Sequence, residues 1–344
     1  MRVAVITNKL IMGGVERALI NLLNSQEYMN YEIDLYLFDI NGEWMNKLPK
    51  KINVVKIEKE NTFSLNSIIN RVYLRVYKNN YHELCYINAK LLKSNNNIMY
   101  DKVISYHAPV SLSVFYALYN LKAKEKILYI HGDVIKCKVD RSFMKQYYNL
   151  FNTIKCVSND AYNVFTQTFP DLIDKTIIEY NIINKAEIFL LSNEVCDNMD
   201  RNCYNILTVA RLSEPKGLEL AIKTMKLLSI YENIKWYIIG EGELQEKLCS
   251  LIDKCGLNNK IVLLGAKDNP YKYMKNCNVY VQPSKHEGYC LTLAEALLLN
   301  KRCICTPFAG AYEQINETNG VIVPYDEYKM FETLLKEYKN WSIK

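Results

Sequence analysis

The sequence predicts an α/β protein built from two domains, each with a parallel sheet. Short runs rich in β-branched and aromatic residues alternate with segments of helical period from the first residues onward, a pattern typical of parallel sheets. The alternation is interrupted once near the middle of the chain and then resumes. The length of 344 residues is about twice that of a typical domain, which agrees with two such units.

The positions of the predicted strands place a boundary between two domains. The strands before the interruption are 3–7, 31–38, 102–106, 126–130 and 153–158, and those after it are 206–210, 235–239, 261–264, 279–282 and 302–305. Acidic and other polar residues accumulate in the interruption. We therefore expect domains at 1–186 and 205–325, joined by a linker at 187–204. Residues 326–344 form a C-terminal helix that starts after Pro324, and packing against the first domain is one option for it.

Composition excludes several classes of protein. A net charge of +6 with 49% hydrophobic residues excludes a chain that is disordered throughout. The 11 cysteines are scattered singly without a Cys-x-x-Cys pair, so we expect reduced thiols and no structural metal. The N-terminal segment lacks the hydrophobic core of a secretory signal, which predicts a cytoplasmic protein. The longest uncharged stretch, 103–121, contains His107 and Pro109, and a buried strand followed by a helix explains it better than a membrane span.

Positive charge is concentrated in the first predicted domain. Residues 51–150 contain 16 Lys and Arg against 7 Asp and Glu. A basic surface of this kind suits an anionic membrane or a phosphorylated acceptor. Much of the charge falls on the segment 64–94, and a solvated helix face explains it equally well.

A pair of glycines follows the first predicted strand. Gly13 and Gly14 precede the amphipathic stretch 15–23, and small residues at a helix start let backbone N–H groups approach a phosphate. The pattern is neither G-x-G-x-x-G nor a Walker A loop, so nicotinamide and P-loop enzymes lose their main support. An ordinary turn is the alternative explanation for the pair.

Two cations flank the loop after the first strand of the second domain. Arg211 follows strand 206–210, and Lys216 precedes the next helix. Ligands of open α/β sheets bind at the carboxyl ends of the strands, so two cations at this place can bind a diphosphate. Ion pairs of Arg211 and Lys216 with Glu214 and Glu219 are the structural alternative.

Two glutamates lie eight residues apart around the start of a later helix. In VQPSKHEGYCLTLAEALLLNK a strand ends near Pro283, Glu287 lies in a turn, and Glu295 lies inside a helix at 291–299. A carboxylate among leucines needs partners, and sugar or ribose hydroxyls are suitable donors. The free N–H groups at the helix start can bind a phosphate. The spacing of the two glutamates is weak evidence when taken alone.

In their order along the chain, these segments resemble the retaining glycosyltransferases of family 4, which have the GT-B fold. The resemblance rests on LTVARLSEPKG, YIIGEGEL, VLLGAKDNPYKYM, VQPSKHEGYCLTLAEAL and TNGVIVP in the second domain. It extends more loosely to IMGGVERALINLL, YIHGD, VSNDAY and EYNIIN in the first. The resemblance implies two Rossmann-like parallel-sheet domains that face each other across a cleft. The first would bind the acceptor and the second the nucleotide sugar.

The resemblance also implies a role for each matching residue. Arg211 and Lys216 would bind the donor diphosphate, and Glu295 would bind the ribose hydroxyls. Glu287 would hold hydroxyls of the transferred sugar, with His131 close to the same sugar, so these two are the candidate catalytic residues. The remaining donor contacts would come from Gly14, Leu264, Gly265, Gly288, Tyr289, Cys290 and Leu291. Cys290 occupies a position where glycine is frequent in the family, but a contact made through the backbone should survive this difference.

The implied activity is transfer of a hexose-type sugar from a nucleotide-diphosphate sugar to a glycan or polyprenyl-diphosphate-linked acceptor. Arg211, Lys216 and the helix start supply positive potential for the leaving group, so we expect neither a cofactor nor a metal. Retention implies attack on the face that the leaving group departs from, which makes Glu287 a poor covalent nucleophile. The expected setting is bacterial polysaccharide or capsule biosynthesis at the inner face of the plasma membrane, as a peripheral protein without a nucleic-acid partner.

Two further hypotheses stay open. The same scaffold could support a nucleotide-sugar epimerase or hydrolase, because fold does not fix reaction. A non-catalytic partner that binds a nucleotide sugar or stabilises another transferase is the third hypothesis. The presence of Arg211, Lys216, Glu287 and Glu295 argues against this last one.

Overall fold

The computed structural model describes residues 1–58, 81–94, 97–109 and 111–343. Two compact units make up the chain, Met1–Ile182 and Ile183–Lys344. Part of the basic segment 64–94, namely residues 64–80, lies outside the described residues. The structure therefore does not place the charged residues of that part on a surface.

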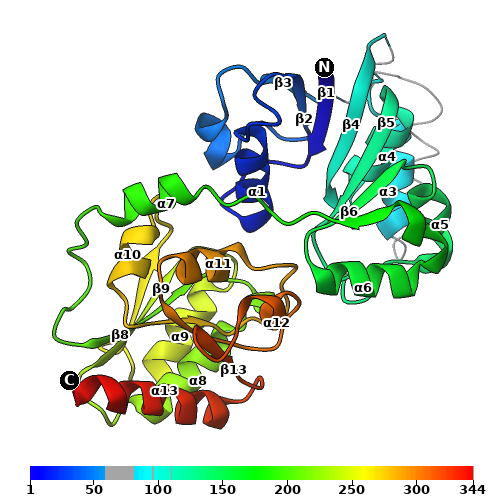
Figure 1. Cartoon of the computed structure of the whole chain (residues 1–344). Coiled ribbons are helices and arrows are strands. Elements are labelled where there is room, and N and C mark those ends of the chain that lie inside the picture. The colour runs from blue at the N-terminus through cyan, green and yellow to red at the C-terminus, as the bar shows by residue number, and fades with distance from the viewer. Residues whose placement is uncertain (59–80, 95–96, 110, 344) are drawn as a thin grey trace. The chain divides into compact units, whose positions relative to one another are not determined.

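In the described part of the first unit, seven strands form a parallel sheet in the order β3-β2-β1-β4-β5-β6-β7 (Figure 1). The elements are β1 (Arg2–Thr7), α1 (Gly14–Leu23), β2 (Glu32–Leu37), η1 (Glu43–Lys47), β3 (Asn53–Lys56), α3 (Tyr81–Lys90), β4 (Met99–Ala108), α4 (Leu112–Tyr119), β5 (Lys122–Ile130), α5 (Arg141–Tyr148), β6 (Thr153–Cys156), α6 (Asn159–Thr168), η2 (Pro170–Lys175) and β7 (Thr176–Ile178).

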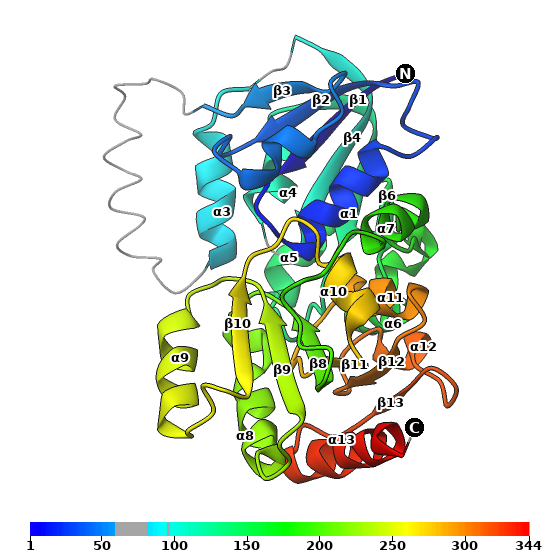
Figure 2. The same ribbon diagram turned by 90° about the vertical axis from the view of Figure 1, so that its left-hand side faces the viewer.

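Helices cover both faces of the first sheet (Figures 1 and 2). The connection from β1 through α1 to β2 runs in the opposite direction to that from β4 through α4 to β5. Right-handed crossovers therefore place α1 and α4 on opposite faces. Helices α3, α4 and α5 pack together through aromatic side chains, since the Tyr147 ring lies 5.4 Å from Tyr86 and 5.0 Å from Phe115 between centroids.

The second unit contains a six-stranded parallel sheet in the order β10-β9-β8-β11-β12-β13 among its described residues. Its elements are α7 (Lys185–Ser192), β8 (Tyr204–Val209), η3 (Glu214–Lys216), α8 (Leu218–Leu228), β9 (Ile234–Ile239), α9 (Gln245–Lys254), β10 (Ile261–Gly265), α10 (Tyr271–Asn276), β11 (Val279–Gln282), α11 (Leu291–Leu298), β12 (Arg302–Cys305), α12 (Ala311–Gln314), β13 (Gly320–Ile322) and α13 (Glu327–Ser342).

Two hydrophobic layers cover the faces of the second sheet. Buried residues of α8, α9 and α13 form one cluster, and those of α7, α10, α11 and α12 form the other. This division follows from the order of the strands, because the connections through α8 and α9 run one way across the sheet and those through α10 and α11 the other. The reversal falls between the neighbouring strands β8 and β11, and ligands of open sheets bind at such a point.

The predicted strands are confirmed, and three further strands were not predicted. Strands β11 and β12 have the predicted bounds, and the other predicted strands are matched within a few residues. The unpredicted β3, β7 and β13 have three or four residues each and lie at edges of the two sheets. Short edge strands are defined by pairing with one neighbour and show little periodicity of their own.

The structure adds detail to two expectations about the second half of the chain. The expected linker at 187–204 is helical in its first part, because α7 begins at Lys185 and buries Ile188 in the cluster beside Tyr271 and Met274 of α10. The C-terminal helix α13 packs within its own unit, where Met330 and Leu334 join the cluster of α8. The hydrophobic face of α13 therefore lies against α8.

Candidate functional site

The loops after β8 and β11 are joined through their backbones. The N–H groups of Lys285 and His286 donate to the Pro215 carbonyl at 2.8 and 3.2 Å. Gly217 has a left-handed φ of 63°, and a Cβ atom there would lie 2.0 Å from the Pro283 carbonyl oxygen. Only glycine permits this approach, which places the end of the first loop directly against the second.

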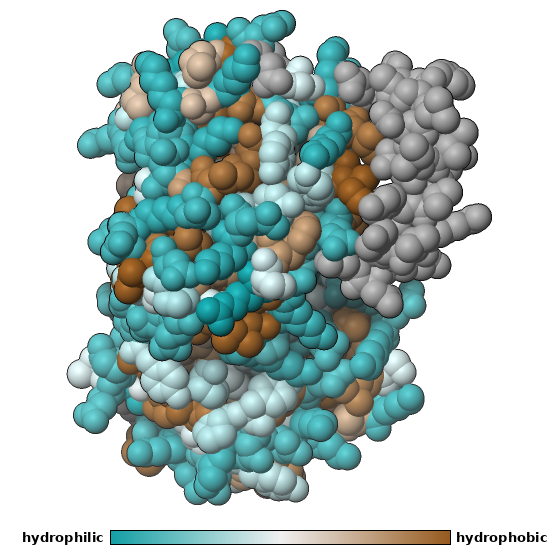
Figure 3. Space-filling view, turned by 90° about the vertical axis from the view of Figure 1, so that its right-hand side faces the viewer, coloured by the Kyte–Doolittle hydropathy of each residue, from teal (hydrophilic) through white to brown (hydrophobic). Residues whose placement is uncertain are grey.

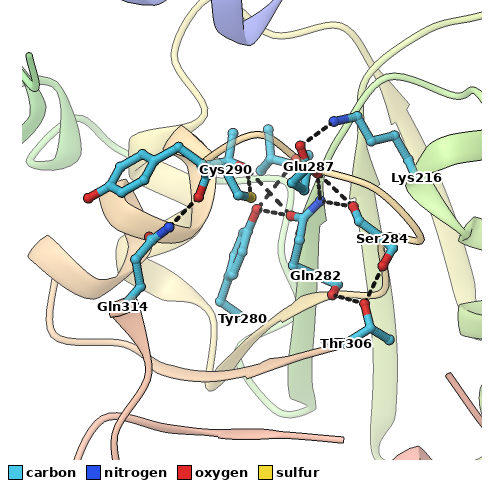
Figure 4. Close-up of polar contacts among 11 residues, drawn as sticks. Lys216, Tyr280, Gln282, Ser284, Glu287, Cys290, Thr306 and Gln314 are labelled. Carbon is cyan, nitrogen blue, oxygen red and sulfur yellow. Dashed lines mark hydrogen bonds and ion pairs between the residues drawn. The ribbon is translucent and has the colours of Figure 1, made fainter. Parts of the chain in front are cut away.

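Lys216 and Glu287 form an ion pair across the two loops (Figure 4). Lys216 Nζ lies 2.7 Å from Glu287 Oε2, and the side chains are 26% and 9% exposed. Burial lowers the pKa of the Lys216 ammonium, but the charge of Glu287 and its hydrogen bond outweigh this effect, so the pKa lies above its usual value. Lys216 is therefore a cation at neutral pH.

The structural alternative for the two cations is wrong. Glu214 pairs with Lys285 at 3.3 Å, and Glu219 pairs with Lys247 at 2.7 Å. Arg211 is exposed at the start of the loop, and no carboxylate of the described residues lies within ion-pair distance of it. Its positive charge acts to lower the pKa of the nearby Lys216. Two neighbouring cations, one of them without an acidic partner in the described part of the chain, are chemically suited to bind an anion.

The other oxygen of Glu287 is held by side chains from its own loop and strand. Glu287 Oε1 accepts from Ser284 Oγ at 2.7 Å and from Gln282 Nε2 at 3.2 Å. Both donors are buried at the end of β11. With Lys216 on Oε2, the carboxylate has three protein donors (Figure 4) and a fixed orientation.

Helix α11 begins beside this carboxylate. Leu291 is its first residue, and Cys290 is the N-cap with a left-handed φ of 68° and no side-chain capping bond. Burial raises the pKa of the Cys290 thiol well above its usual value, so the thiol is neutral. The positive end of the helix dipole and the backbone N–H groups of the first turn favour an anion at this place.

The turn before α11 is held from the side of α12. The Tyr289 carbonyl accepts from Gln314 Nε2, and the backbone of Tyr289 approaches Gly310 so closely that a Cβ there would lie 3.0 Å from Tyr289 Cα. Gly288 is half-buried in the same turn. These contacts fix the backbone whose groups the sequence assigned to the donor.

Glu295 lies inside the second unit on α11. Glu295 is only 4% exposed. Its Oε1 atom accepts a 2.9 Å hydrogen bond from the hydroxyl of Tyr271 on α10. The partner that a carboxylate needs among leucines is thus supplied in part by the protein. The sequence prediction did not include Tyr271.

Leu264 and Gly265 end β10 at the same edge of the sheet. Gly265 has a left-handed φ of 71°, and its carbonyl accepts from the Gly240 N–H at 3.0 Å. The next residue, Ala266, donates its N–H to Glu241 Oε1 at 3.2 Å. The loops after β9 and β10 therefore form one connected border at the carboxyl ends of the strands.

Gly14 and His131 belong to the first unit, whereas all other predicted site residues belong to the second. Gly14 is the first residue of α1, and a Cβ there would meet no heavy atom within 4 Å. His131 follows β5, where its ring lies 4.6 Å from that of Tyr106 between centroids. Burial and the neighbouring His107 lower the pKa of His131 to about 3, so its imidazole is neutral.

Sequence reasoning missed Gln282, Ser284 and Tyr280 as members of the site. A polar residue at the end of the buried strand VYVQ was an available signal, because a buried amide needs hydrogen-bond partners. The partners themselves come from separate segments and could not be read from spacing.

The ranges that the structure describes contain neither a metal-binding cluster nor a membrane-spanning helix. Within these ranges, no group of three or more His, Cys, Asp or Glu side chains could hold a metal ion. No helix formed by the described residues combines the length and the hydrophobicity needed to span a bilayer. Figure 3 shows one face of the molecule, on which hydrophilic residues predominate and hydrophobic ones are scattered between them.

Residues 198–340 match the protein family described as glycosyl transferases group 1. An uncharacterised glycosyltransferase of Methanocaldococcus jannaschii is 30% identical over 272 residues, which cover 72% of this chain and 66% of that protein. A Campylobacter jejuni enzyme named as an N-acetylgalactosaminyltransferase acting on a diphospho-undecaprenol-linked glycan is 32% identical over 51% of this chain and 50% of its own length. This chain thus spans between half and about two thirds of these relatives.

A solved structure is similar over nearly the whole chain. The Anabaena protein HepE, determined in complex with UDP and glucose, has a TM-score of 0.72 with 17% identity, over 97% of this chain and 89% of that one. Together with the two parallel-sheet units, this likeness shows that the chain has the two-domain Rossmann-like fold known as GT-B.

Proposed function

We propose that the chain, whose residues 198–340 match the glycosyl transferases group 1 family, is a retaining glycosyltransferase. It moves a hexose-type sugar from a nucleotide-diphosphate sugar to a glycan or polyprenyl-diphosphate-linked acceptor. The observation that carries this proposal is the Lys216–Glu287 ion pair of 2.7 Å beside the start of α11. This pair places a cation that can bind a diphosphate next to a carboxylate that can accept hydrogen bonds from sugar hydroxyls.

The leaving diphosphate gains negative charge as the glycosidic bond breaks. Arg211, Lys216 and the N-terminal end of α11 all present positive potential at the carboxyl ends of β8 and β11. Preorganised charge of this kind stabilises a transition state without further reorganisation. In this proposal it does the work that a divalent cation does in other transferases, so activity should survive chelation with EDTA.

The two glutamates have different surroundings, which suits two different hydroxyl groups. Glu287 lies in the loop after β11, where it pairs with Lys216, and is assigned to the transferred sugar. Glu295 lies deeper on α11 beside Tyr271 and is assigned to the ribose. The similar Anabaena structure contains UDP and glucose, which supports a nucleotide sugar as the donor.

Retention by front-face attack agrees with the state of Glu287. Its carboxylate accepts from Lys216, Ser284 and Gln282, and such a stabilised anion is a weak nucleophile. His131 is neutral because burial lowers its pKa to about 3, and it is proposed to lie beside the transferred sugar. Neither residue is assigned a covalent intermediate.

The acceptor is proposed to be linked to a polyprenyl diphosphate at the inner face of a bacterial plasma membrane. The relative from Campylobacter jejuni is named for such an acceptor, and residues 51–150 have a surplus of positive charge. Lys and Arg residues near anionic lipid contribute about 1 kcal/mol each. The setting is polysaccharide or capsule biosynthesis by a cytoplasmic, peripheral protein.

A thermal-shift screen of nucleoside diphosphates and nucleotide sugars tests the donor site. A ligand at about 100 times its dissociation constant adds about 2.7 kcal/mol to the unfolding free energy. We expect one nucleotide sugar to stabilise the wild type, and Arg211→Ala and Glu295→Ala to lose this effect. Lys247→Ala is the matched control, because it removes an exposed cation of the same unit that pairs with Glu219.

The products separate the remaining hypotheses. A transferase consumes the donor rapidly only with an acceptor, an epimerase alters the sugar without one, and a hydrolase releases free sugar. Stabilisation without turnover on any acceptor would favour a non-catalytic partner. If no nucleotide sugar stabilised the wild type, the proposed donor site would be wrong.

A further inference from the structure

A chain of buried polar side chains connects the interior of the second unit to Glu287 (Figure 4). Tyr280 and Gln282 are both on β11, and Gln282 is only 1% exposed. The Tyr280 hydroxyl donates to Gln282 Oε1 at 2.7 Å, and Gln282 Nε2 donates to Glu287 Oε1 at 3.2 Å. Gln282 is therefore the link between a buried hydroxyl and the carboxylate of the site.

The surroundings of Gln282 determine which way its amide group faces. Its oxygen accepts from two hydroxyls, Tyr280 at 2.7 Å and Thr292 at 3.4 Å. Its nitrogen faces Ser284 Oγ at 2.8 Å and the Glu287 carboxylate. The reverse orientation would place the amide oxygen against a carboxylate that can only accept, so the network selects the orientation that donates to Glu287.

The backbone beneath this amide is also fixed. Thr306, which follows β12, donates its N–H and its hydroxyl to the Gln282 carbonyl at 3.2 and 3.3 Å. The same hydroxyl contacts the Ser284 carbonyl. The end of β11 is thus held to the neighbouring strand on both sides of Pro283. These bonds hold the backbone of Gln282 in place.

The hydrogen bonds of the described residues leave Glu287 one acceptor position for a ligand. A carboxylate offers about four lone-pair positions on its two oxygens. Gln282 and Ser284 occupy Oε1, and Lys216 occupies one position of Oε2. The remaining position is on Oε2, beside the Lys216 ammonium.

We propose that Gln282 is a positioning residue that directs this free position of Glu287 Oε2 toward one hydroxyl of the donor sugar. The inference rests on the proposed function and adds to it a residue outside the assigned donor contacts. Without the amide donor, Oε1 keeps only Ser284 and the carboxylate can rotate away from the sugar. Substitution of Gln282 should then weaken binding of the sugar part of the donor and have much less effect on binding of the diphosphate.

Two substitutions of Gln282 test this role through pH. In Gln282→Glu, two carboxylates lie side by side at high pH and repel each other, and at lower pH they share one proton. The protonated carboxyl group of this variant then donates a hydrogen bond to Glu287 as the amide does. Gln282→Met has a similar length but cannot donate at any pH.

The measurement is the dissociation constant of each variant between pH 5.5 and 8.5, by calorimetry. The probes are UDP-glucose, UDP-N-acetylglucosamine and GDP-mannose, together with UDP and GDP, which lack the sugar. For the nucleotide sugar that the wild type binds, we expect about tenfold weaker binding by Gln282→Met at every pH, since a hydrogen bond to a charged group is lost. Gln282→Glu should bind equally weakly at pH 8.5 and return toward the wild-type value at pH 5.5. The diphosphates should bind all variants within about threefold, since Gln282 contacts none of the diphosphate-binding cations.

Three control variants make the outcome specific. Gln245→Glu introduces the same change at an exposed position of the same unit and should bind like the wild type at each pH. Tyr280→Phe and Ser284→Ala leave Gln282 in place, and each removes one donor from the network. They replace the Gln282 variants in the test if those variants do not fold. Both should weaken binding of the nucleotide sugar more than binding of the diphosphate.

The possible failures are distinguishable. If folded Gln282→Met binds the nucleotide sugar as tightly as the wild type, or if the loss in Gln282→Glu does not depend on pH, the positioning role is wrong and the proposed function stands. The same holds if Tyr280→Phe and Ser284→Ala bind normally when the Gln282 variants do not fold. If the wild type binds neither these three nucleotide sugars nor any other one in the thermal-shift screen, the proposed function fails and this inference fails with it.

Discussion

The Tyr271 hydroxyl of α10 donates a 2.9 Å hydrogen bond to Glu295 Oε1 of α11. The two helices cover the same face of the second sheet, and this bond lies in the interior between them. A buried carboxylate is stabilised only when donors surround it. Tyr271 therefore links the stability of this helical layer to the residue assigned to the ribose.

Tyr271→Phe should lower the unfolding free energy by about 1–3 kcal/mol, because a buried carboxylate loses one of its donors. Urea unfolding measures this change. Tyr273→Phe on the same helix is the matched control, since among the described residues the Tyr273 hydroxyl has one hydrogen bond, which it accepts from Asn198 at 3.4 Å. Equal losses in the two variants would contradict the special role of Tyr271.

Gly217→Ala should destabilise the second unit more than Gly256→Ala. Both glycines are left-handed, with φ of 63° and 68°, but only at Gly217 would a Cβ collide with the Pro283 carbonyl, at 2.0 Å. The left-handed conformation alone costs an alanine about 1–2 kcal/mol, which is the loss expected for Gly256→Ala. A larger loss in Gly217→Ala, with weaker nucleotide-sugar binding, is the expected result of urea unfolding and calorimetry.

Cys290→Gly should keep the donor affinity within about twofold, because glycine adopts the φ of 68° freely and the proposed contacts here are made by the backbone. Cys290→Val should destabilise the chain by about 1–3 kcal/mol, since a β-branched residue is strained in this conformation. Thermal unfolding and calorimetry test both variants. Loss of donor binding in a folded Cys290→Gly would show that the thiol itself matters.

His131→Gln should remove part of the loss of stability in acid. The pKa of His131 is lowered to about 3 by burial, so below the unfolded value near 6.5 the unfolded chain binds a proton that the folded chain does not. The neutral His131 therefore contributes to the unfolding free energy above pH 6.5. This contribution is lost as the pH falls toward 3, by about 1 kcal/mol per pH unit.

Unfolding midpoints in urea between pH 7 and 4 test the histidine prediction. The wild type should fall more steeply than His131→Gln, whereas the exposed His286→Gln should follow the wild type. Burial also lowers the pKa of His82, so His131→Gln should keep part of the slope. Identical slopes for the wild type and His131→Gln would contradict the neutral state of the His131 imidazole.

The two parallel-sheet domains, and the second-domain strands that end at the candidate site, could be predicted from the sequence alone. Strands β11 and β12 have their predicted bounds because continuous apolar runs between polar turns are unambiguous in a buried parallel sheet. The positions of Lys216 and Glu287 near strand ends also followed from the chain, since carboxyl ends of parallel strands share one edge. The position of Glu295 inside the following helix was predicted from the same segment.

The pairing of those residues, by contrast, depends on the tertiary fold. Lys216 and Glu287 are separated by 71 positions, and local charge spacing favoured Glu214 and Glu219 instead. Tyr271, Tyr280 and Gln282 became part of the site because β8 and β11 are neighbours in the sheet and α10 packs beside α11. Such partners depend on strand order and helix packing, which bring distant segments together, whereas periodicity and spacing report only on local structure.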